Sequence, residues 1–404
     1  MATRTIGIVI DGATGRLGTT QHLRALLAMR AEGGLPLGNG DRLMPEPVLL
    51  GRNAARLAAL AEKSGGLKWS TDRDACLADP AIDIYFDATA TGGRPDRARA
   101  AFAAGKHVYL EKPIAENLED ALALARAAER AGKKGGVVQD KLFLPGLKKL
   151  RKLYEANFFG RVLSVRLDFG WWVFDGTPYP AQRPSWNYRK ATGGGLILDM
   201  FAHWRYIFDR LLGEVKAVSC RHMTGVPERR DEAGNPYRID VEDTAFATFE
   251  LAGGVLAQVS ASWASRVKRD DLLQIQVDGT RGSAVCGLHR CFVQPLAATP
   301  KPFFDPERPQ PMVFDEHRAT IDQRRGIPGH EDEDLRGIAE TERLHREMAQ
   351  HVVGDMIDED QKEGYAAEKI EPNVARRRRD GSGRYLAALA SDKEPDKLLR
   401  QFGG

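Results

Sequence analysis

The chain has 404 residues, of which 42% are hydrophobic and 28% are charged, and its formal net charge is +3. The length predicts two domains, and the composition is typical of a soluble globular enzyme. So small a net charge gives no argument for nucleic acid, and no apolar stretch reaches the roughly 18 residues that a membrane span needs. We therefore expect neither nucleic acid nor a membrane among the partners.

The N-terminus and the cysteines both predict a cytoplasmic protein. Residues 1–5 run straight into an apolar strand pattern, without the apolar core of a secretory signal. The chain has four cysteines, which are scattered without metal-ligand spacing: Cys76, Cys220, Cys286 and Cys291. We interpret them as reduced, mostly buried thiols in a reducing compartment, and we expect no bound metal.

Short apolar runs alternate with helical patterns through the first 140 residues. The predicted strands are residues 6–10, 48–50, 82–86, 107–110 and 137–138. The predicted helices are one that follows the first strand and residues 54–63, 95–104 and 118–131. This alternation predicts βαβ units and a parallel sheet. Residues 33–47, rich in glycine and proline, are predicted to be a surface insertion.

From about residue 160 the pattern changes to strands of alternating polarity. They are predicted at residues 162–169, 244–251, 255–263, 273–277 and 284–288, with glycine-containing turns between them. This arrangement predicts an antiparallel sheet in an α+β domain. The fold class is therefore α/β, with a Rossmann domain at residues 1–145 and an α+β domain at residues 146–315. Residues 316–404 form a charged segment, with helical patterns near residues 344–353 and 385–389.

A glycine-rich turn, Asp11–Gly18, follows the first strand and opens a helix. Glycines permit a tight turn and let the backbone approach a pyrophosphate, and the helix start supplies N–H groups and partial positive charge. The spacing is G-x-x-G-x-x-G, so a turn that serves only helix–sheet packing is the alternative. We predict a dinucleotide site contacted by Gly12, Thr14, Gly15, Arg16, Leu17 and Gly18.

The end of the second strand carries Arg52 and Asn53 and no acidic residue. An acid there would bind the ribose 2′-hydroxyl, whereas an arginine accommodates a 2′-phosphate. We therefore predict NADP as the cofactor, with NAD possible if Arg52 only stacks on adenine or faces solvent. After the strand at 82–86, the small residues Ala88, Thr89 and Ala90 leave room for the ribose and nicotinamide.

The tripeptide Glu111-Lys112-Pro113 follows the strand at 107–110. Proline restricts Lys112 to extended geometry and makes the Lys112–Pro113 bond a candidate cis peptide. Both Glu111 and Lys112 are predicted to contact the cofactor. A lysine held there can also bind a substrate hydroxyl and stabilise a developing alkoxide. The alternative is a surface lysine paired with Glu111.

Three glycines, residues 193–195, precede a helix that carries Asp199 and His203. A spacing of four puts the carboxylate and the imidazole on one helix face. With Lys112 they form a proton-transfer set, for which we predict catalytic roles. The alternative for His203 is a core histidine whose ring is satisfied by a carbonyl.

Aromatic residues cluster just before this helix, with basic residues among them. We predict that five residues of this region bind substrate: Trp171, Trp172, Arg183, Trp186 and Tyr188. Aromatic faces and hydrogen-bonding groups suit a sugar ring, which has apolar C–H faces and equatorial hydroxyls. The alternative is that the aromatics form the core of the second domain.

Two motifs together resemble the Gfo/Idh/MocA family, which includes glucose–fructose oxidoreductase and inositol dehydrogenase. Residues 104–113 are similar to the central signature of that family, and residues 193–203 are similar to its second signature, glycines followed by D-x-x-x-H. Asp243 resembles a further recurrent position. The resemblance runs from about residue 5 to about residue 296.

The resemblance implies a Rossmann domain, a C-terminal domain with a large open sheet, and NAD(P)-dependent oxidation or reduction of a sugar, polyol or glycoside. It implies that His203 is the general base or acid, that Lys112 polarises the reacting hydroxyl and that Asp199 orients the substrate. We expect a homo-oligomer, a dimer or a tetramer, with a carbohydrate substrate.

Two other function classes stay open on the sequence. Some relatives hold NAD tightly and use transient oxidation to cleave a glycoside, as hydrolases or lyases, and net NAD(P)H formation distinguishes them from dehydrogenases. The other class is a cofactor-sensing regulator without catalysis, and retention of Lys112, Asp199 and His203 argues against it.

Overall fold

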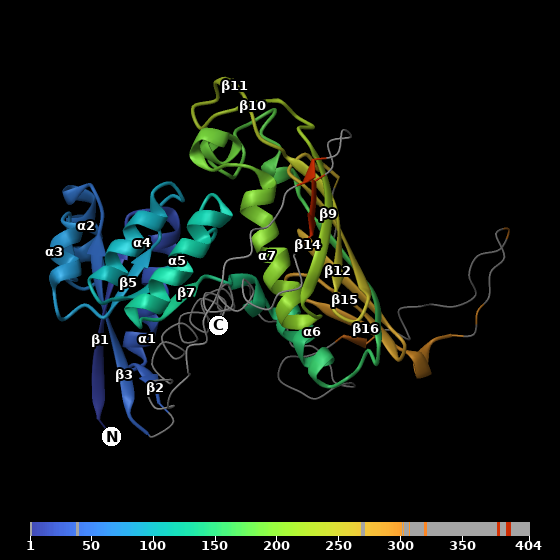
Figure 1. Ribbon diagram of the computed structural model, residues 1–404, viewed down its shortest axis with the longest axis horizontal. Coiled ribbons are helices and arrows are strands. Elements are labelled where there is room, and N and C mark those ends of the chain that lie inside the picture. The colour runs from blue at the N-terminus through green and yellow to red at the C-terminus, as the bar shows by residue number, and fades with distance from the viewer. Residues whose placement is uncertain are drawn as a thin grey trace. The chain divides into compact units, whose positions relative to one another are not determined.

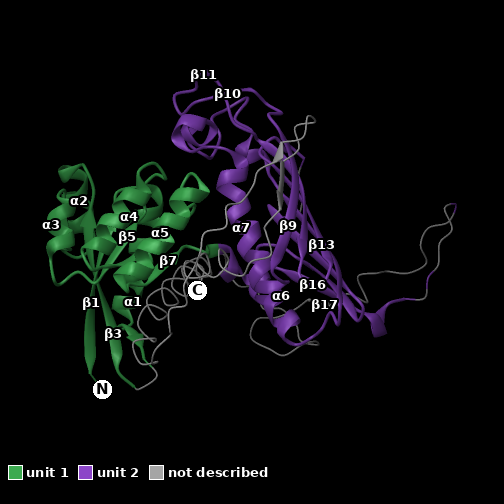
Figure 2. Cartoon of the chain, in the orientation of Figure 1, with its two compact units in different colours: residues 1–140, 335–372, 392–404 green, residues 141–334, 373–391 purple. Residues whose placement is uncertain are grey.

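The computed structural model describes residues 2–37, 40–267, 271–300, 302 and 307, and the backbone of 319–320, 378–379 and 385–388. These residues form two compact units (Figure 2). The first holds the described residues up to Asp140, and the second holds those from Lys141 onward. No helix in the described part of the chain is long and apolar enough to cross a membrane.

The first unit is built on a seven-stranded sheet. Its strands are β1 (Thr3–Asp11), β2 (Leu35–Pro36), β3 (Arg42–Leu50), β4 (Trp69–Ser70), β5 (Ile84–Asp87), β6 (His107–Leu110) and β7 (Gly135–Val137). All pairings are parallel except that of β2 with β3. Numbered in chain order, the parallel strands lie in the order 3-2-1-4-5-6, which is typical of a Rossmann sheet. The predicted Rossmann fold is thus confirmed.

Helices flank this sheet (Figure 1). After a π-helical turn at Gly18–Leu23 they are α1 (Arg24–Ala31), α2 (Ala54–Lys63), α3 (Arg73–Ala78), α4 (Arg94–Ala103) and α5 (Leu118–Ala131). Three of them begin at a side chain that accepts a backbone N–H of the first turn, namely Asn53, Asp72 and Asn117. Such caps satisfy a helix-start donor that has no intrahelical partner.

The prediction of a surface insertion at residues 33–47 is wrong, because the second half of that segment is strand β3. β3 pairs with β1 along its whole length, from Thr3 opposite Arg42 to Asp11 opposite Leu50. On its other side it pairs only near its two ends, with β2 and with β4. The middle of that side is a strand edge, where the missing N–H groups of Pro45 and Pro47 cost no ladder hydrogen bond.

The second unit contains a ten-stranded sheet in the order β17-β16-β15-β14-β8-β13-β12-β9-β19-β18. The main strands are β8 (Val162–Phe169), β9 (Val215–Met223), β12 (Thr244–Leu251), β13 (Val255–Ser262), β14 (Leu273–Gly279), β15 (Gly282–Cys286) and β16 (Cys291–Pro295). Two-residue strands β17 (Ala319–Thr320) and β18 (Arg378–Arg379) lie at its edges, and β10 (Glu228–Arg230) and β11 (Pro236–Arg238) form a separate hairpin. Among the described strands of this sheet only the β8–β13 pairing is parallel, so the mostly antiparallel sheet is confirmed.

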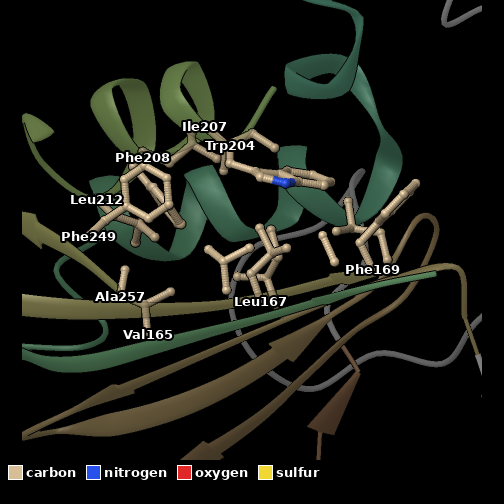
Figure 3. Close-up of a cluster of buried hydrophobic side chains, with 14 of the residues drawn as sticks. Val165, Leu167, Phe169, Trp204, Ile207, Phe208, Leu212, Phe249 and Ala257 are labelled. Atoms are coloured by element: carbon tan, nitrogen blue, oxygen red, sulfur yellow. The ribbon is translucent and has the colours of Figure 1, made fainter. Parts of the chain in front are cut away.

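Two helices, α6 (Pro145–Glu155) and α7 (Leu196–Leu211), pack against this sheet (Figure 1). The apolar stripe of α7 presents Trp204, Ile207 and Phe208, all fully buried. Figure 3 shows them facing inward residues of β8 and β12, such as Leu167 and Phe249. Burying side chains of this size contributes about 1.5–3 kcal/mol each, so packing fixes the position of α7 on the sheet.

Two further expectations are corrected. The segment near residues 385–389, predicted helical, includes strand β19 (Tyr385–Ala388), whose backbone pairs with β9.

The expectation of four reduced thiols is wrong for Cys286 and Cys291, which form a disulfide. The β15–β16 hairpin places these two residues directly opposite each other, with their Cα atoms 4.1 Å apart. The helical pattern predicted near residues 344–353 lies outside the described residues.

Candidate active site

The glycine turn of the first unit lies at the carboxyl end of β1, held against its two neighbouring strands. The N–H groups of Gly12 and Ala13 both donate to the carbonyl of Leu50, the last residue of β3. On the other side, a Cβ on Gly12 would come within 3.0 Å of the Ala88 backbone after β5, and its φ of +83° also favours glycine. The turn therefore needs glycine at this position.

The rest of the turn fits a dinucleotide. Gly15 and Arg16 are exposed where the helix begins, while Thr14 and Leu17 are half-buried. Gly18 packs against the start of the turn, since a Cβ there would lie 2.4 Å from the carbonyl oxygen of Gly12. Exposed backbone N–H groups at a helix start, with glycines that allow a close approach, are the groups that bind a pyrophosphate.

Arg52 is exposed just after β3, at the carboxyl ends of the parallel strands, where a ribose would lie. Asn53 has a structural task, because its side-chain oxygen accepts the N–H of Arg56, at 3.0 Å, as the cap of α2. An open groove of 240 Å³ runs between the glycine turn and α2, lined by Thr14, Thr19, Arg56, Ala59, Leu60 and Lys63. The sequence analysis did not include Arg56. Its position in the first turn of α2, four residues after Arg52, could have indicated that it lies near the predicted cofactor site.

Buried charges hold the loops that follow β5 and β6. The Asp87 carboxylate accepts the backbone N–H of Thr89 at 2.9 Å and its hydroxyl at 2.7 Å, and Arg97 Nε donates to it at 2.7 Å. Arg94, only 1% exposed, donates to the carbonyl of Thr89 and to the carbonyl of Pro113. The Arg94 guanidinium therefore connects the loop at residues 88–90, predicted to lie beside the nicotinamide, to the Lys112–Pro113 segment.

Burial lowers the pKa of Arg94, and the Asp87 and Glu111 carboxylates oppose that effect. The Lys112–Pro113 bond is cis, which confirms the expectation from the sequence. Arg94 and Arg97 were missed by sequence reasoning, because a guanidinium that reaches a carbonyl 19 residues away leaves no pattern in the spacing.

Glu111 is also tied into the interior of the first unit. One of its carboxylate oxygens lies 2.6 Å from Nε2 of His22, which comes from the helix behind the glycine turn. Both side chains are buried, and the His22 ring packs on Phe86 at 4.4 Å between centroids. The residue before Lys112 is thus linked to the element that opens with the glycine turn.

In the second unit, the start of α7 is set by Glu242. The carbonyl of Glu242 accepts the N–H of Leu196 at 3.1 Å, and its carboxylate accepts the N–H of Ile197 at 2.8 Å. Gly195, at φ +121°, leaves the space for this contact, since a Cβ there would lie 2.8 Å from the carboxylate. Glycine at this position therefore lets Glu242 cap the helix that bears Asp199 and His203.

Asp199 and His203 are both buried on α7, one turn apart. Arg183 Nη1 lies 2.7 Å from the Asp199 carboxylate, and its guanidinium is 5.3 Å from the ring centroids of both Phe174 and Trp263. The structure thus brings Arg183, predicted as a substrate contact, to the predicted catalytic carboxylate. An arginine between two aromatic rings is fixed in place, and so it orients the carboxylate that it pairs with.

The predicted aromatic residues separate into two groups. Trp172 and Trp186 are 51% and 39% exposed, and Trp171 lies beside Trp172 at 5.0 Å between centroids. Tyr188 is fully buried, its hydroxyl donates to the carbonyl of Phe174 at 2.8 Å, and its ring packs on Trp263. The structure therefore places Tyr188 in the core and leaves the tryptophans accessible to a ligand.

Asp243 has a structural role. It forms a fully buried ion pair with Arg229, at 2.6 Å, and accepts the N–H groups of Gly225 and Val226 at 2.7 and 2.9 Å. Arg229 also donates to the carbonyls of Phe174 and Asp175. These contacts connect the β10–β11 segment to the loop that carries the aromatic residues.

Family models match both units. The model described as "Oxidoreductase family, NAD-binding Rossmann fold" matches residues 6–139, and that described as "GFO/IDH/MocA C-terminal domain" matches residues 147–285. D-xylose dehydrogenase of Paenarthrobacter nicotinovorans is 49% identical over 317 residues, which are 77% of this chain and 82% of the relative. The chain belongs to the Gfo/Idh/MocA family.

Further similar proteins have lower identity to this chain. Levoglucosan dehydrogenase of Pseudarthrobacter phenanthrenivorans is 28% identical over 58% of this chain and 63% of the relative. A solved levoglucosan dehydrogenase in complex with NADH and levoglucosan matches with a TM-score of 0.67 at 22% identity, over 87% of this chain and 90% of that one. An oxidoreductase domain protein from Kribbella flavida gives a TM-score of 0.69 at 24% identity, over 89% and 91%. These two structures share the fold of this chain.

The family assignment confirms the class of enzyme predicted from the motifs. The protein is an oxidoreductase with an NAD-binding Rossmann domain, and its relatives include sugar and polyol dehydrogenases. The 49% identity to a D-xylose dehydrogenase favours the dehydrogenase class over the hydrolase or lyase alternative.

Proposed function

We propose that the protein is an NAD(P)-dependent dehydrogenase that oxidises a hydroxyl carbon of D-xylose or a similar aldose. The observation that carries this proposal is the buried pair on α7, in which His203 lies one turn after Asp199 and Arg183 holds the carboxylate. The substrate class is supported by the 49% identity to a D-xylose dehydrogenase.

In this proposal the residues of the chain divide the work on one hydroxyl group. His203 removes the hydroxyl proton, a task suited to imidazole because it exchanges a proton near neutral pH. Lys112 stabilises the negative charge that develops on the oxygen, and the Asp199–Arg183 pair orients the sugar. A bound nicotinamide supplies the hydride acceptor.

The exposed tryptophans, Trp172 and Trp186, and the neighbouring Trp171 are the proposed contacts for the apolar face of the sugar. Their exposure supports this assignment, whereas Tyr188 supports the site only from the core. A homo-oligomeric state and a cytoplasmic location stay predictions from the sequence.

For the cofactor we propose NADP in preference to NAD. Arg52 is exposed after β3 where no acid stands, and Arg56 lines the groove beside the glycine turn. Two guanidinium groups near one ribose would favour a 2′-phosphate. Replacing Arg52 and Arg56 by glutamine should raise the KM for NADP about tenfold or more and leave that for NAD within about twofold. Equal effects on both cofactors would contradict the assignment.

The function is tested by incubating the protein with a panel of aldoses, polyols and glycosides and with each cofactor. We expect stoichiometric formation of reduced cofactor, seen by its absorbance, with D-xylose among the best substrates. Consumption of a glycoside without net reduction would instead favour the hydrolase or lyase class. Reduction with a polyol but with no aldose would overturn the substrate assignment.

A further inference from the structure

His203 has a hydrogen-bond partner on its own helix. Its Nδ1 atom lies 2.7 Å from the hydroxyl oxygen of Tyr206, three residues further along α7. The two rings meet edge to face, with centroids 5.5 Å apart, and they are only 3% and 8% exposed. Because bulk water does not compete in so buried a place, this hydrogen bond fixes the orientation of the imidazole.

The Tyr206 hydroxyl is held by the backbone as well. The N–H of Lys141 donates to its oxygen at 3.1 Å. A phenol has one hydrogen to donate and can accept at its oxygen, so the contact with Lys141 still leaves it able to donate to or accept from His203. Only the tautomer with hydrogen on Nδ1 leaves Nε2 free to take a proton, and in that tautomer Nδ1–H donates to the phenol oxygen while the phenol hydrogen turns away from the ring.

We propose that Tyr206 is the positioning residue for His203. Its hydroxyl oxygen accepts a hydrogen bond from Nδ1–H and so orients the ring, while Nε2 takes the substrate proton. The inference rests on the proposed function, since it assigns a partner to the proposed base. The O–H bond of the substrate breaks as the Nε2–H bond forms, and Tyr206 keeps its own proton. The positive charge stays on the imidazole and is stabilised by the Nδ1–H bond to the phenol oxygen.

The partner of the His203 imidazole is an uncharged phenol, and this affects how easily the ring gives up a proton. Asp199 precedes His203 by one turn, but its charge is matched by Arg183, and Lys141 contributes a backbone N–H to Tyr206. A carboxylate in the place of Tyr206 would add a full negative charge and hold the imidazolium strongly. A phenol stabilises it by one hydrogen bond only, so the ring can release the proton before the next turnover.

The Tyr206→Phe variant tests this inference, because it keeps the ring and removes the hydroxyl. We expect kcat for sugar oxidation to fall about tenfold or more, as for the loss of a hydrogen bond to a charged group, while the KM for the cofactor stays within about twofold. The acid limb of the kcat/KM profile should move to lower pH by about one unit, because the imidazolium loses its acceptor.

A matched control is Thr224→Val, which removes another hydroxyl of the second unit. The Thr224 hydroxyl donates to the carbonyl of Val241 at 2.8 Å. This variant should lose a similar amount of stability and keep the wild-type pH profile. If Tyr206→Phe behaves like this control, Tyr206 has a structural role only and the inference is wrong.

A second measurement needs no substrate. In protein with ¹⁵N-labelled histidine, the His203 ring signals are those missing from His203→Ala. Their titration midpoint should be lower in Tyr206→Phe than in wild type, and in wild type the Nδ1 hydrogen should exchange slowly with water at low pH. An unchanged midpoint, or rapid exchange in the wild type, would overturn the inference. A shifted midpoint in a protein that oxidises no sugar would instead reject the proposed function and leave the Tyr206–His203 contact standing.

Discussion

The two units of this protein hold their candidate functional residues by different means. In the first unit these residues lie on loops at strand ends, and buried charges hold the loops: Arg94 binds two loop carbonyls, Asp87 binds Thr89, and Glu111 binds His22. In the second unit Asp199 and His203 lie on a helix whose apolar stripe packs on a sheet.

The difference follows from what each element can bury. A loop at the end of a strand has no continuous apolar face, so hydrogen bonds to its backbone must fix it. A helix such as α7 is fixed by Trp204, Ile207 and Phe208, and single polar partners then only orient individual side chains. A changed polar residue in the first unit should therefore disturb a whole loop, whereas one in the second unit should disturb a single functional group.

The largest effect is expected for His203→Ala. Losing a general base costs about 10²–10⁴-fold in kcat, and because α7 is held by its apolar stripe, the fold and cofactor affinity should be unaffected. Steady-state kinetics and titration with reduced cofactor, followed by fluorescence, measure the two quantities. The exposed His222 on β9 supplies the control, His222→Ala, for which no change is expected. Near-wild-type turnover by His203→Ala would end its assignment as the base.

The Arg94→Met variant should disturb a loop and the stability of the first unit together. It leaves buried Asp87 with one arginine fewer and two carbonyls without their donor, at a cost of about 3–5 kcal/mol in the free energy of unfolding. Urea denaturation measures this loss, and the KM for the cofactor should rise in parallel. Arg99→Met is the matched control, because its pair with Asp96 is on the surface and should contribute less than about 1 kcal/mol. Equal losses in both variants would show that Arg94 does not hold the loops.

Asn53→Ala separates capping from cofactor binding. Losing the cap of α2 should cost about 1 kcal/mol of stability. Asn117→Ala removes the equivalent cap of α5, which accepts the N–H of Asp120 at 2.8 Å, and should cost the same. Thermal unfolding and the KM for NADP are compared for the two variants. A higher KM in Asn53→Ala alone would support the predicted cofactor contact, and equal KM values would leave Asn53 as a cap only.

The smallest effect is expected for the two free thiols, one in each unit. Burial raises the pKa of Cys76. Burial and the nearby Glu242 carboxylate raise the pKa of Cys220 to about 11, so at pH 8 only about 0.1% of it is thiolate. We expect a disulfide reagent to react slowly with the native protein, leaving activity unchanged, and rapidly once urea has unfolded it. Fast modification of the native protein would show that one unit opens around its thiol.

The sequence by itself determined the alternation of strands and helices in the first unit and the position of each motif. Alternating apolar runs predicted the Rossmann sheet, and the glycines of the first turn predicted a backbone that only glycine adopts, as Gly12 does. These features are local, because hydrophobic period and backbone conformation are properties of a few consecutive residues.

Only the tertiary structure decided the partners of those motifs. Sheet register and helix packing bring Arg94 to Pro113 and Arg183 to Asp199. They also place β3 beside β1, with its prolines at an open strand edge. The same holds for the strand at Tyr385–Ala388 and for the disulfide across the β15–β16 hairpin. A hydrogen bond or ion pair depends on the distance between two atoms in space, and residues that are far apart along the chain carry no local pattern that fixes this distance.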